Sequence, residues 1–358
     1  MSKFYSLTIA QVRQETRDTI VATFAIPGAL KERFAFVQGQ HLTLRARVNG
    51  EDLRRSYSIC SAVQDDDLRI AIKRTPGGQF STWANDTLKP GVAVEVMPPM
   101  GHFNLPLDGA SRKRYLAFAA GSGITPILSI IKTVLALEPH SSFTLVYGNR
   151  ASSSVIFREE LAELKDVYLE RLALVYVMSR EQQDIDLFNG RITRQKCEQL
   201  FDGWLDVADH DAAFVCGPES MMQEVSQALQ AYGMPKDAIK VELFAASIPR
   251  KTKLAHTVPA GAAKDCEVTV VMDGNHRSFS MRRDEESVLD AALRQGVDMR
   301  YSCKGGVCAT CRCKVLDGKV EMDANFALED YEIARGFVLS CQAFPVTDRL
   351  VIDFDQDT

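Results

Sequence analysis

The hydrophobic pattern of the chain changes twice along its length. Over roughly the first hundred residues, short apolar runs that partly alternate with polar residues are separated by Gly, Pro and Asp turns. Such spacing is typical of strands in a small antiparallel barrel. The runs that we interpret as strands are LTIAQV, IVATFAI, HLTLRARV, LRIAIKR and VAVEVM.

From Arg114 onward the pattern is different. Continuous apolar runs, typical of buried strands, alternate with segments of helical period, and this alternation predicts a parallel sheet covered by helices. The predicted strands are RYLAFAA, FTLVYG, LALVYVMS and AAFVCG, and the clearest helices are ILSIIKTVLAL and SMMQEVSQALQAYG.

After VELF, small residues, Pro and Lys replace the periodic apolar positions, and we interpret residues 246–264 as a linker. A third unit follows, with the strand CEVTVVM, a DGNH turn that suits a hairpin, and a final strand RLVIDF. Between them we expect a short helix around Ser287–Gln295, with Gly296 as its C-terminal stop. The expected boundaries are therefore 1–108, 109–245, 246–264 and 265–358.

Composition excludes several classes of function. The 358 residues carry a mild net charge of −5 and no long run of Lys or Arg. We therefore expect neither a nucleic-acid nor a membrane-surface partner, because both are bound through clustered basic residues. No apolar stretch reaches the roughly 18–20 residues that span a bilayer, and the first residues lack a signal-peptide pattern. These features predict a cytoplasmic protein.

The cysteines carry the most specific chemical signal. The spacing Cys303-x4-Cys308-x2-Cys311, with Cys341 far downstream, is that of plant-type [2Fe–2S] ferredoxins. Glycines at 305 and 306 would let backbone N–H groups turn toward the sulfur atoms. Zinc is the main alternative, although zinc sites favour paired C-x2-C knuckles, and free thiols are a further one. Cys313 is expected to be a neighbour of the cluster rather than a ligand.

Two motifs in the β-rich part favour a flavin site. In the RSYS motif, between barrel-like strands, Arg55 would pair with a flavin phosphate, Tyr57 would lie against the isoalloxazine, and Ser58 would hydrogen-bond flavin N5. About twenty residues on, GGQFS at 77–81 resembles a loop turning into a helix N-terminus, whose N–H groups can hold a pyrophosphate. Each motif alone also fits an ordinary strand or turn.

Two further motifs favour a nicotinamide site. GSGITP at 121–126 follows a predicted strand and precedes a helix, where glycines and the helix N-terminus admit phosphates. Its sixth position is Pro126, so it departs from the standard dinucleotide fingerprint. Cys216, in VCGP, ends another predicted strand and would sit beside the nicotinamide ring, although such a cysteine is more often part of the core.

These motifs, in this order, resemble the ferredoxin–NADP⁺ reductase superfamily with a plant-type ferredoxin fused at the C-terminus. Within it, LRRSYSIC, AAGSGITP, LVYGNR, VCGP and CKGGVCATCRCKVLDGKV are similar to reductase subunits of phenylacetyl-CoA 1,2-epoxidases. The resemblance implies FAD rather than FMN, NADPH as the donor, and the di-iron oxygenase subunits of that epoxidase as the acceptor. It also implies an antiparallel β-barrel FAD-binding domain (1–108), an α/β parallel-sheet NAD(P)-binding domain (109–245) and an α+β, β-grasp ferredoxin domain (265–358).

The resemblance also assigns roles by position. It implies that the flavin is held by Arg55, Tyr57, Ser58, Gly78 and Ser81, the nicotinamide dinucleotide by Gly121, Gly123, Thr125, Pro126, Cys216 and Gly217, and the cluster by Cys303, Cys308, Cys311 and Cys341. Ser58 and Cys216 are the residues expected to flank the reacting atoms.

Residues near Arg150 favour NADPH over NADH. Asn149 and Arg150 follow a predicted strand where a 2′-phosphate is expected, and no Asp or Glu occurs between Tyr147 and Arg158. An acidic residue there would instead have favoured NADH. Alternatives that the sequence leaves open are a different oxygenase as the partner, a non-enzymatic module that binds zinc and a nucleotide, and a redox sensor, although no basic helix pair for DNA is evident.

Overall fold

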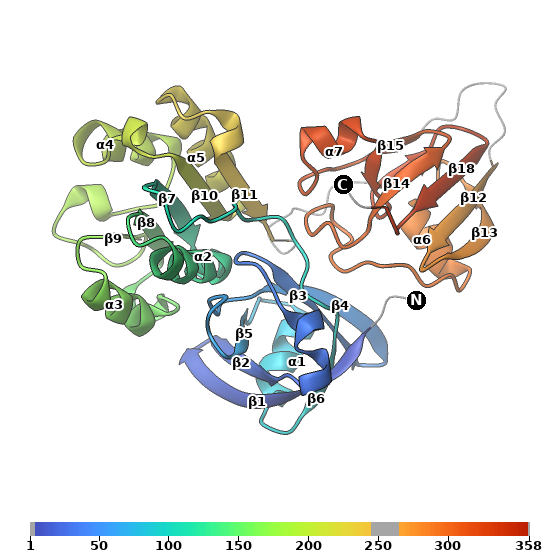
Figure 1. The fold of residues 1–358 in the computed structure, drawn as a ribbon, viewed down its shortest axis with the longest axis horizontal. Helices are drawn as coiled ribbons and strands as arrows, with labels where there is room; N and C mark the ends of the chain where they lie inside the picture. The colour runs from blue at the N-terminus through green and yellow to red at the C-terminus, as the bar shows by residue number, and fades with distance from the viewer. Residues whose placement is uncertain (1–3, 245–264, 357–358) are drawn as a thin grey trace. The chain divides into compact units, whose positions relative to one another are not determined.

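The computed structural model describes residues 4–244 and 265–356, so the predicted linker at 246–264 lies outside the described residues. The chain divides into two compact units. One holds an antiparallel and a parallel sheet, and the other holds a C-terminal mixed sheet (Figure 1). The expected boundaries between domains remain predictions.

The N-terminal sheet is antiparallel and closes on itself. Its strand order is β4-β3-β6-β1-β2-β5, and a bridge between Ile59 and Ile70 joins its two edges just beyond β4. Inward side chains such as Leu7, Leu42 and Leu44 are fully buried, each stabilising the fold by about 1.5–3 kcal/mol. The elements are β1 (Tyr5–Thr16), β2 (Thr19–Ala25), β3 (His41–Val48), β4 (Glu51–Ser58), β5 (Leu68–Lys73), β6 (Ala93–Val96) and α1 (Gln79–Thr87).

The second sheet is wholly parallel, with order β11-β10-β7-β8-β9. Helices α2 and α3 cover one face and α4 and α5 the other (Figure 1). The first strand of this sheet, β7, lies at its centre. The next two strands, β8 and β9, are added on one side of β7, and β10 and β11 are added on the other, so the strand order reverses beside β7. The elements are β7 (Arg114–Ala120), β8 (Ser142–Asn149), β9 (Leu172–Met178), β10 (Ala212–Gly217), β11 (Ile239–Leu243), α2 (Ile124–Leu137), α3 (Arg158–Val167), α4 (Arg194–Gly203) and α5 (Glu219–Ala231).

The C-terminal unit has a mixed sheet of order β13-β12-β18-β14-β16 and a separate pair, β15 with β17. The hairpin turn at Asp273 and Gly274 has positive φ at both residues, as the DG sequence predicts. Helix α6 is capped by the Ser287 hydroxyl and is followed by Gly296 at φ +75°. The elements are β12 (Asp265–Met272), β13 (Asn275–Arg282), β14 (Arg312–Asp317), β15 (Val320–Met322), β16 (Phe337–Leu339), β17 (Ala343–Pro345), β18 (Arg349–Asp353), α6 (Val288–Arg294) and α7 (Asp330–Ala334).

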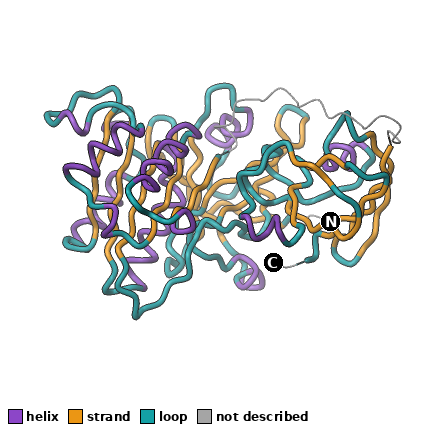
Figure 2. Tube along the Cα trace, turned by 90° about the horizontal axis from the view of Figure 1, so that it is seen from above, coloured by secondary structure: helices purple, strands orange, loops and turns teal. Residues whose placement is uncertain are grey.

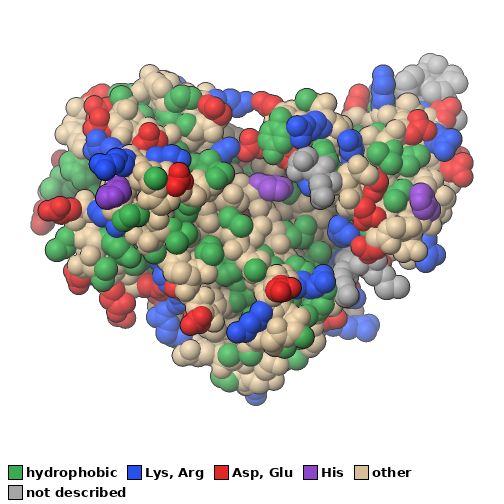
Figure 3. All heavy atoms as spheres, viewed as in Figure 1, with side chains coloured by type: hydrophobic (Ala, Val, Ile, Leu, Met, Phe, Trp, Pro, Cys, Tyr) green, Lys and Arg blue, Asp and Glu red, His purple; other side chains and the backbone are tan. Residues whose placement is uncertain are grey.

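The predicted fold class is confirmed: an antiparallel barrel, a parallel α/β sheet and an α+β C-terminal unit. Most helix surrounds the parallel sheet, whereas the rest of the chain is mainly strand and loop (Figure 2). None of the helices within 4–244 and 265–356 is long and apolar enough to span a bilayer. On the face shown in Figure 3, basic side chains are interspersed with acidic ones.

Candidate functional site

The RSYS motif lies within a strand, β4, and not between strands as the sequence analysis placed it. Because side chains alternate along a strand, Arg55 and Tyr57 share one face while Ser58 points to the other. Arg55 is exposed, Tyr57 is half-buried and Ser58 is buried. The Tyr57 ring lies 5.9 Å from that of Phe80, the second residue of α1. The strand therefore presents an arginine and an aromatic ring together on one side.

The second predicted flavin motif forms the start of α1. Gly78 is the N-cap, and the first turn has no acidic residue, so the helix N-terminus can attract an anion. A Cβ on Gly78 would come within 2.6 Å of Ser81 Oγ, which explains the glycine. The Ser81 hydroxyl accepts a hydrogen bond from Thr75 N–H (3.1 Å) and donates to the Gly78 carbonyl (3.3 Å). Ser81 thus closes the loop, and its predicted contact with a pyrophosphate stays a prediction.

The two predicted nicotinamide motifs meet at the carboxyl ends of β7 and β10. These strands are neighbours at the point where the strand order reverses, which is where open α/β sheets bind ligands. A Cβ on Gly123 would lie 2.1 Å from the Cys216 carbonyl oxygen. Only glycine allows this approach, so the sequence positions 121–123 and 216–217 form one surface.

The start of α2 explains why proline stands at position 126. The helix begins at Ile124 with Gly123 as N-cap, so Pro126 occupies the first turn. Its missing N–H is not needed there because the first N–H groups of a helix have no internal partner. Thr125 is buried, and its hydroxyl donates to the Ser122 carbonyl (3.0 Å). The motif is therefore a tight turn that leads directly into a helix.

Glu242 joins the predicted flavin and nicotinamide residues, and sequence reasoning missed it. The Ser58 hydroxyl donates to Glu242 Oε2 at 3.0 Å. On the adjoining strand, Cys216 is the register partner of Glu242. Burial, and after it the Glu242 charge, raise the pKa of Cys216 well above its usual value, so Cys216 is a neutral thiol. The available signal was an acidic residue at the carboxyl end of the apolar strand VELF.

His41 lies opposite Ser58 on β3. The Ile59 N–H donates to the Gln40 carbonyl at 2.9 Å, which sets this antiparallel register. The histidine is buried, and its pKa falls to about 4, first because of burial and then because of the charge of His102. At neutral pH it is an uncharged neighbour of Ser58.

Arg150 lies at the exposed end of β8, next to a second arginine that the sequence analysis did not name. The Arg180 N–H, just after β9, donates to the Arg150 carbonyl at 2.9 Å. A carboxylate is also present: Glu181 accepts hydrogen bonds from the N–H and the hydroxyl of Ser152, with 2.8 Å for the former. These bonds lower the pKa of Glu181, and they hold its carboxylate against Ser152. The backbones of Arg150 and Arg180 therefore lie side by side at the ends of two neighbouring strands.

The four predicted cluster cysteines come together as two pairs. A hydrogen bond from the Cys308 thiol lowers the pKa of Cys303 to about 7, and Cys311 is hydrogen-bonded to Cys341. Among the described residues, no three His, Cys, Asp or Glu side chains are arranged around one metal ion. All four thiols lie close enough to shift one another's pKa values, and it is their spacing along the sequence that favours a [2Fe–2S] cluster over zinc.

The backbone of this loop turns its N–H groups toward the sulfur atoms. Gly305 N–H donates to Cys303 Sγ at 3.3 Å. Positive φ values occur at Lys304, Gly306 and Ala309, two of which the sequence did not predict because they are not glycines. A Cβ on Gly306 would lie 2.9 Å from the Ala324 carbonyl oxygen, so this glycine is required. The Gly305 N–H therefore favours a thiolate at Cys303, whereas hydrogen bonding and burial raise the pKa values of Cys308 and Cys311.

The other cysteines belong to the core. Cys313 is buried in β14, where its thiol faces the Val338 carbonyl at 3.8 Å, and burial raises its pKa. The thiols of Cys60, Cys197 and Cys266 are buried as well.

Comparison with known families gives three matches in chain order. Residues 6–105 match the oxidoreductase FAD-binding domain, residues 118–227 the oxidoreductase NAD-binding domain, and residues 270–346 the 2Fe-2S iron-sulfur cluster binding domain.

Individual relatives match over the full length. The chain is 48% identical, over 99% of both chains, to a component of the 1,2-phenylacetyl-CoA epoxidase of Escherichia coli K12. It is 37% identical to the ferredoxin reductase component of 3-ketosteroid-9-alpha-monooxygenase from Rhodococcus rhodochrous, over 99% of this chain and 97% of that one. Among solved structures, phthalate dioxygenase reductase, described as modular for electron transfer from pyridine nucleotides to [2Fe-2S], matches with a TM-score of 0.56 and 25% identity over 98% of both chains.

Proposed function

This chain belongs to the ferredoxin–NADP⁺ reductase superfamily, and we propose that it carries electrons from NADPH to the di-iron oxygenase subunits of a phenylacetyl-CoA 1,2-epoxidase. It is an NAD(P)H-dependent flavin and iron–sulfur oxidoreductase with FAD-binding, NAD-binding and 2Fe–2S domains. Bound FAD would accept a hydride from the nicotinamide and pass electrons singly to the [2Fe–2S] cluster.

The observation that best supports the proposal is the contact between Ser58 and Glu242. It joins the predicted flavin strand to β11, which is paired with the strand that carries Cys216. The residues predicted to lie beside flavin N5 and beside the nicotinamide ring are therefore both neighbours of one carboxylate. Hydride transfer needs this closeness, because the reacting atoms must approach to about 3–3.5 Å.

The remaining residues bind and orient. Arg55 and Tyr57 would hold the flavin phosphate and ring, and the N-terminus of α1 at Gly78 and Ser81 the pyrophosphate. The turn that contains Gly121, Gly123, Thr125 and Pro126 would hold the nicotinamide dinucleotide, with Gly217 beside it. The paired thiols of Cys303, Cys308, Cys311 and Cys341 would ligate the cluster.

Preference for NADPH is proposed to come from Arg150 and Arg180, which adjoin at the ends of β8 and β9. Substituting either by Ala should raise the KM for NADPH about tenfold or more while leaving that for NADH nearly unchanged, since a charged hydrogen bond contributes about 1.5–3 kcal/mol. A wild-type protein that prefers NADH would contradict this assignment.

Reconstitution tests the whole proposal. The protein and NADPH are mixed with phenylacetyl-CoA epoxidase oxygenase subunits, and phenylacetyl-CoA-dependent product is measured. Product that requires this chain supports the proposed donor and partner. If the chain reduces ferricyanide with NADPH but yields no epoxide, its partner is a different oxygenase.

A further inference from the structure

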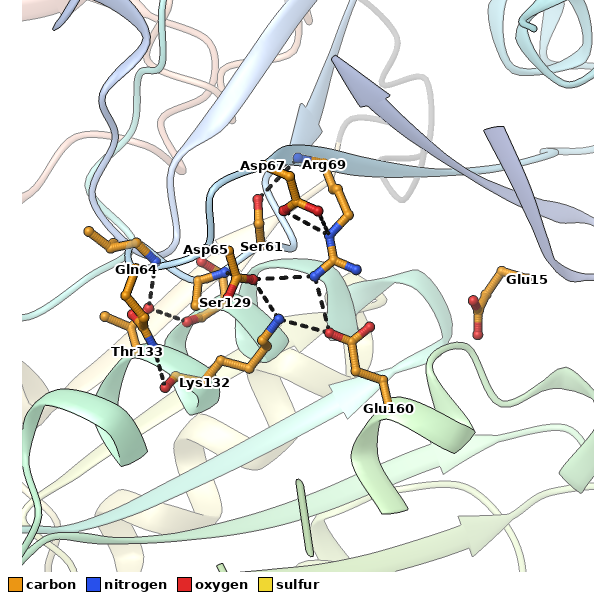
Figure 4. Close-up of polar contacts among 12 residues, drawn as sticks. Glu15, Ser61, Gln64, Asp65, Asp67, Arg69, Ser129, Lys132, Thr133 and Glu160 are labelled. Atoms are coloured by element: carbon orange, nitrogen blue, oxygen red, sulfur yellow. Dashed lines mark hydrogen bonds and ion pairs between the residues drawn. The ribbon is translucent and has the colours of Figure 1, made fainter. Parts of the chain in front are cut away.

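Four charged side chains form a closed ring between the barrel and the parallel-sheet part of the same unit (Figure 4). Lys132 Nζ lies 2.6 Å from Asp65 and 2.9 Å from Glu160, and Arg69 Nη2 lies 3.3 Å from Asp65 and 3.2 Å from Glu160. Charges alternate around this charge ring, and each carboxylate contacts both cations. Two members come from the barrel side, Asp65 and Arg69, and two from helices α2 and α3.

The charge ring is shielded from solvent. Its side chains are only 13–25% exposed. Hydrogen bonds beside it also cross between the two parts: Val63 N–H donates to Thr133 Oγ1 at 3.2 Å, and the Gln64 amide donates to the Lys132 carbonyl at 3.1 Å (Figure 4). The loop at 59–67 is thereby fastened to α2 through directional polar contacts.

Both fastened segments lead directly to the candidate hydride-transfer site. The loop at 59–67 starts immediately after Ser58, the last residue of β4. Helix α2 begins next to Gly123, which touches the Cys216 backbone. Lys132 lies about two helical turns further along, or roughly 12 Å. A rigid helix and a short loop therefore connect the charge ring to the flavin side and to the nicotinamide side.

The start of α3 is fixed to the barrel at a second point. Buried Phe157, its N-cap, has φ of +61°, a conformation that bulky residues rarely adopt. Its N–H donates at 2.8 Å to the carboxylate of Glu15, which lies on β1. Such a strained residue persists where its surroundings hold it. Glu160 follows within the first turn of the same helix, so the charge ring and Glu15 hold one helix end together.

We propose that the charge ring is a positioning device, which fixes the distance between the flavin strand and the nicotinamide-binding helix. Partly buried ion pairs add little net stability, because desolvation offsets most of the attraction, but their geometry can fix a register that apolar contacts would let slide. Asp65, Arg69, Lys132 and Glu160 are positioning residues in this role. The proposal rests on the proposed function, in which hydride passes between the two sides.

The test uses the full-length protein with Glu160→Gln, which removes one charge and keeps the shape. The matched control is Glu198→Gln, which breaks the exposed Arg194–Glu198 pair within α4. Flavin reduction is followed by anaerobic stopped flow, with NADPH and with NADPH deuterated at C4. We expect Glu160→Gln to slow flavin reduction about tenfold or more with an unchanged Kd for NADPH and a more temperature-dependent isotope effect, since small misplacements cost large factors in rate.

A second readout does not depend on activity. In flavin-free protein, amide hydrogen exchange in residues 59–67 should accelerate in Glu160→Gln and not in Glu198→Gln. Lys132→Arg, which keeps the charge, should retain more than half of the wild-type rate of flavin reduction. If Glu160→Gln fails to fold, Lys132→Met takes its place as the variant that breaks the charge ring, and Lys132→Arg is then its charge-conserving control.

Two outcomes overturn the proposal. One is a folded variant with wild-type flavin reduction and isotope effect, and the other is a variant whose only change is a lower Tm. Failure of the wild-type protein to reduce its flavin with NADPH would instead reject the proposed function itself.

Discussion

At the residue scale, Glu242 determines what Ser58 can offer to a flavin. The Ser58 hydroxyl donates its hydrogen to Glu242 at 3.0 Å, so its oxygen can still accept a hydrogen bond. A hydroxyl held in this way can accept from a protonated flavin N5. Glu242 also contributes to the raised pKa of Cys216, after burial, and so keeps that thiol uncharged. One carboxylate therefore acts on both predicted catalytic residues.

Replacing Glu242 by Gln should slow flavin reduction by NADPH while FAD content stays near that of the wild type. The amide can donate as well as accept, so the orientation of the Ser58 hydroxyl is no longer fixed. Stopped-flow rates of Glu242→Gln, Ser58→Ala and the double variant give the coupling, which we expect to be about 1–3 kcal/mol. Additive effects would show that the two side chains act separately.

Gly123 should not tolerate a side chain. A Cβ there would meet the Cys216 carbonyl oxygen at 2.1 Å and Gly217 N at 3.1 Å, and both are backbone atoms that cannot move away cheaply. Gly123→Ala is expected to lower stability by about 1–3 kcal/mol and to raise the KM for NADPH. The control is Gly203→Ala in α4, where nothing lies within 4 Å. Urea unfolding and steady-state kinetics measure both, and equal behaviour of the two variants would contradict the expectation.

At the scale of elements, the helices hold the site from a distance. Helix α2 has its N-terminus at the proposed nucleotide site and contributes Lys132, in its third turn, to the charge ring. Burial opposes ionisation of Asp65, but hydrogen bonds from Lys132 and from Ala62 N–H outweigh it and lower the pKa of Asp65. Burial also opposes the charge of Lys132, yet the bonds to Asp65 and Glu160 raise its pKa.

These shifts set a pH window for the charge ring. A carboxyl group whose pKa is lowered on folding stabilises the fold when the pH is above its pKa in the unfolded chain, about 3.9. This stabilisation is lost as the pH falls through the lower pKa of the folded state. A lysine whose pKa is raised on folding stabilises the fold when the pH is below its pKa in the unfolded chain, about 10.4. This stabilisation is lost as the pH rises through the higher pKa of the folded state. Asp65→Asn should therefore lower the urea midpoint at pH 7, and the difference from wild type should shrink below about pH 4.

The control for this experiment is Asp86→Asn, whose carboxylate pairs with Arg74 on the exposed surface. Exposed pairs contribute little, so its midpoint should hardly move at either pH. A loss for Asp65→Asn that is independent of pH would point to packing instead of charge.

At the scale of the whole molecule, the chain separates hydride chemistry from single-electron delivery. The barrel and the parallel sheet carry the residues around Ser58 and Cys216, and the C-terminal unit carries its own core and the paired thiols. Because the four proposed ligands of the cluster all belong to the C-terminal unit, cluster loss should leave the flavin reaction intact.

Cys303→Ser tests this division. The variant should lose the visible absorption of the cluster and all epoxide formation with the oxygenase, yet keep NADPH-driven ferricyanide reduction. Cys313→Ser is the control: its buried thiol packs in the core, so it should lower stability but retain the cluster. If ferricyanide reduction vanished in folded, FAD-loaded Cys303→Ser, the two halves would not be independent.

The fold class and the identity of the motifs could be predicted from the sequence. The periodicity of apolar residues indicates which segments are strands or helices, because the residues on the buried face of an element recur with the period of that element. Positions 121–123, 216–217 and the cysteine spacing were recognisable because each depends on local geometry: a tight turn, a strand end, or thiolates converging from one loop. Helix α6, with its Ser287 cap and Gly296 stop, was predictable for the same reason.

Which residues meet across the chain became visible only in the folded protein. Glu242 lies 184 positions from Ser58, and Lys132 lies 67 from Asp65, and no local pattern marks either pair. An acidic residue in a strand or a lysine in a helix has the same secondary-structure propensity whether or not the fold brings an oppositely charged or hydrogen-bonding partner next to it. Positive φ at Lys304 and Ala309 was hidden likewise, because what holds a non-glycine residue in that conformation is its surroundings, not its own preference.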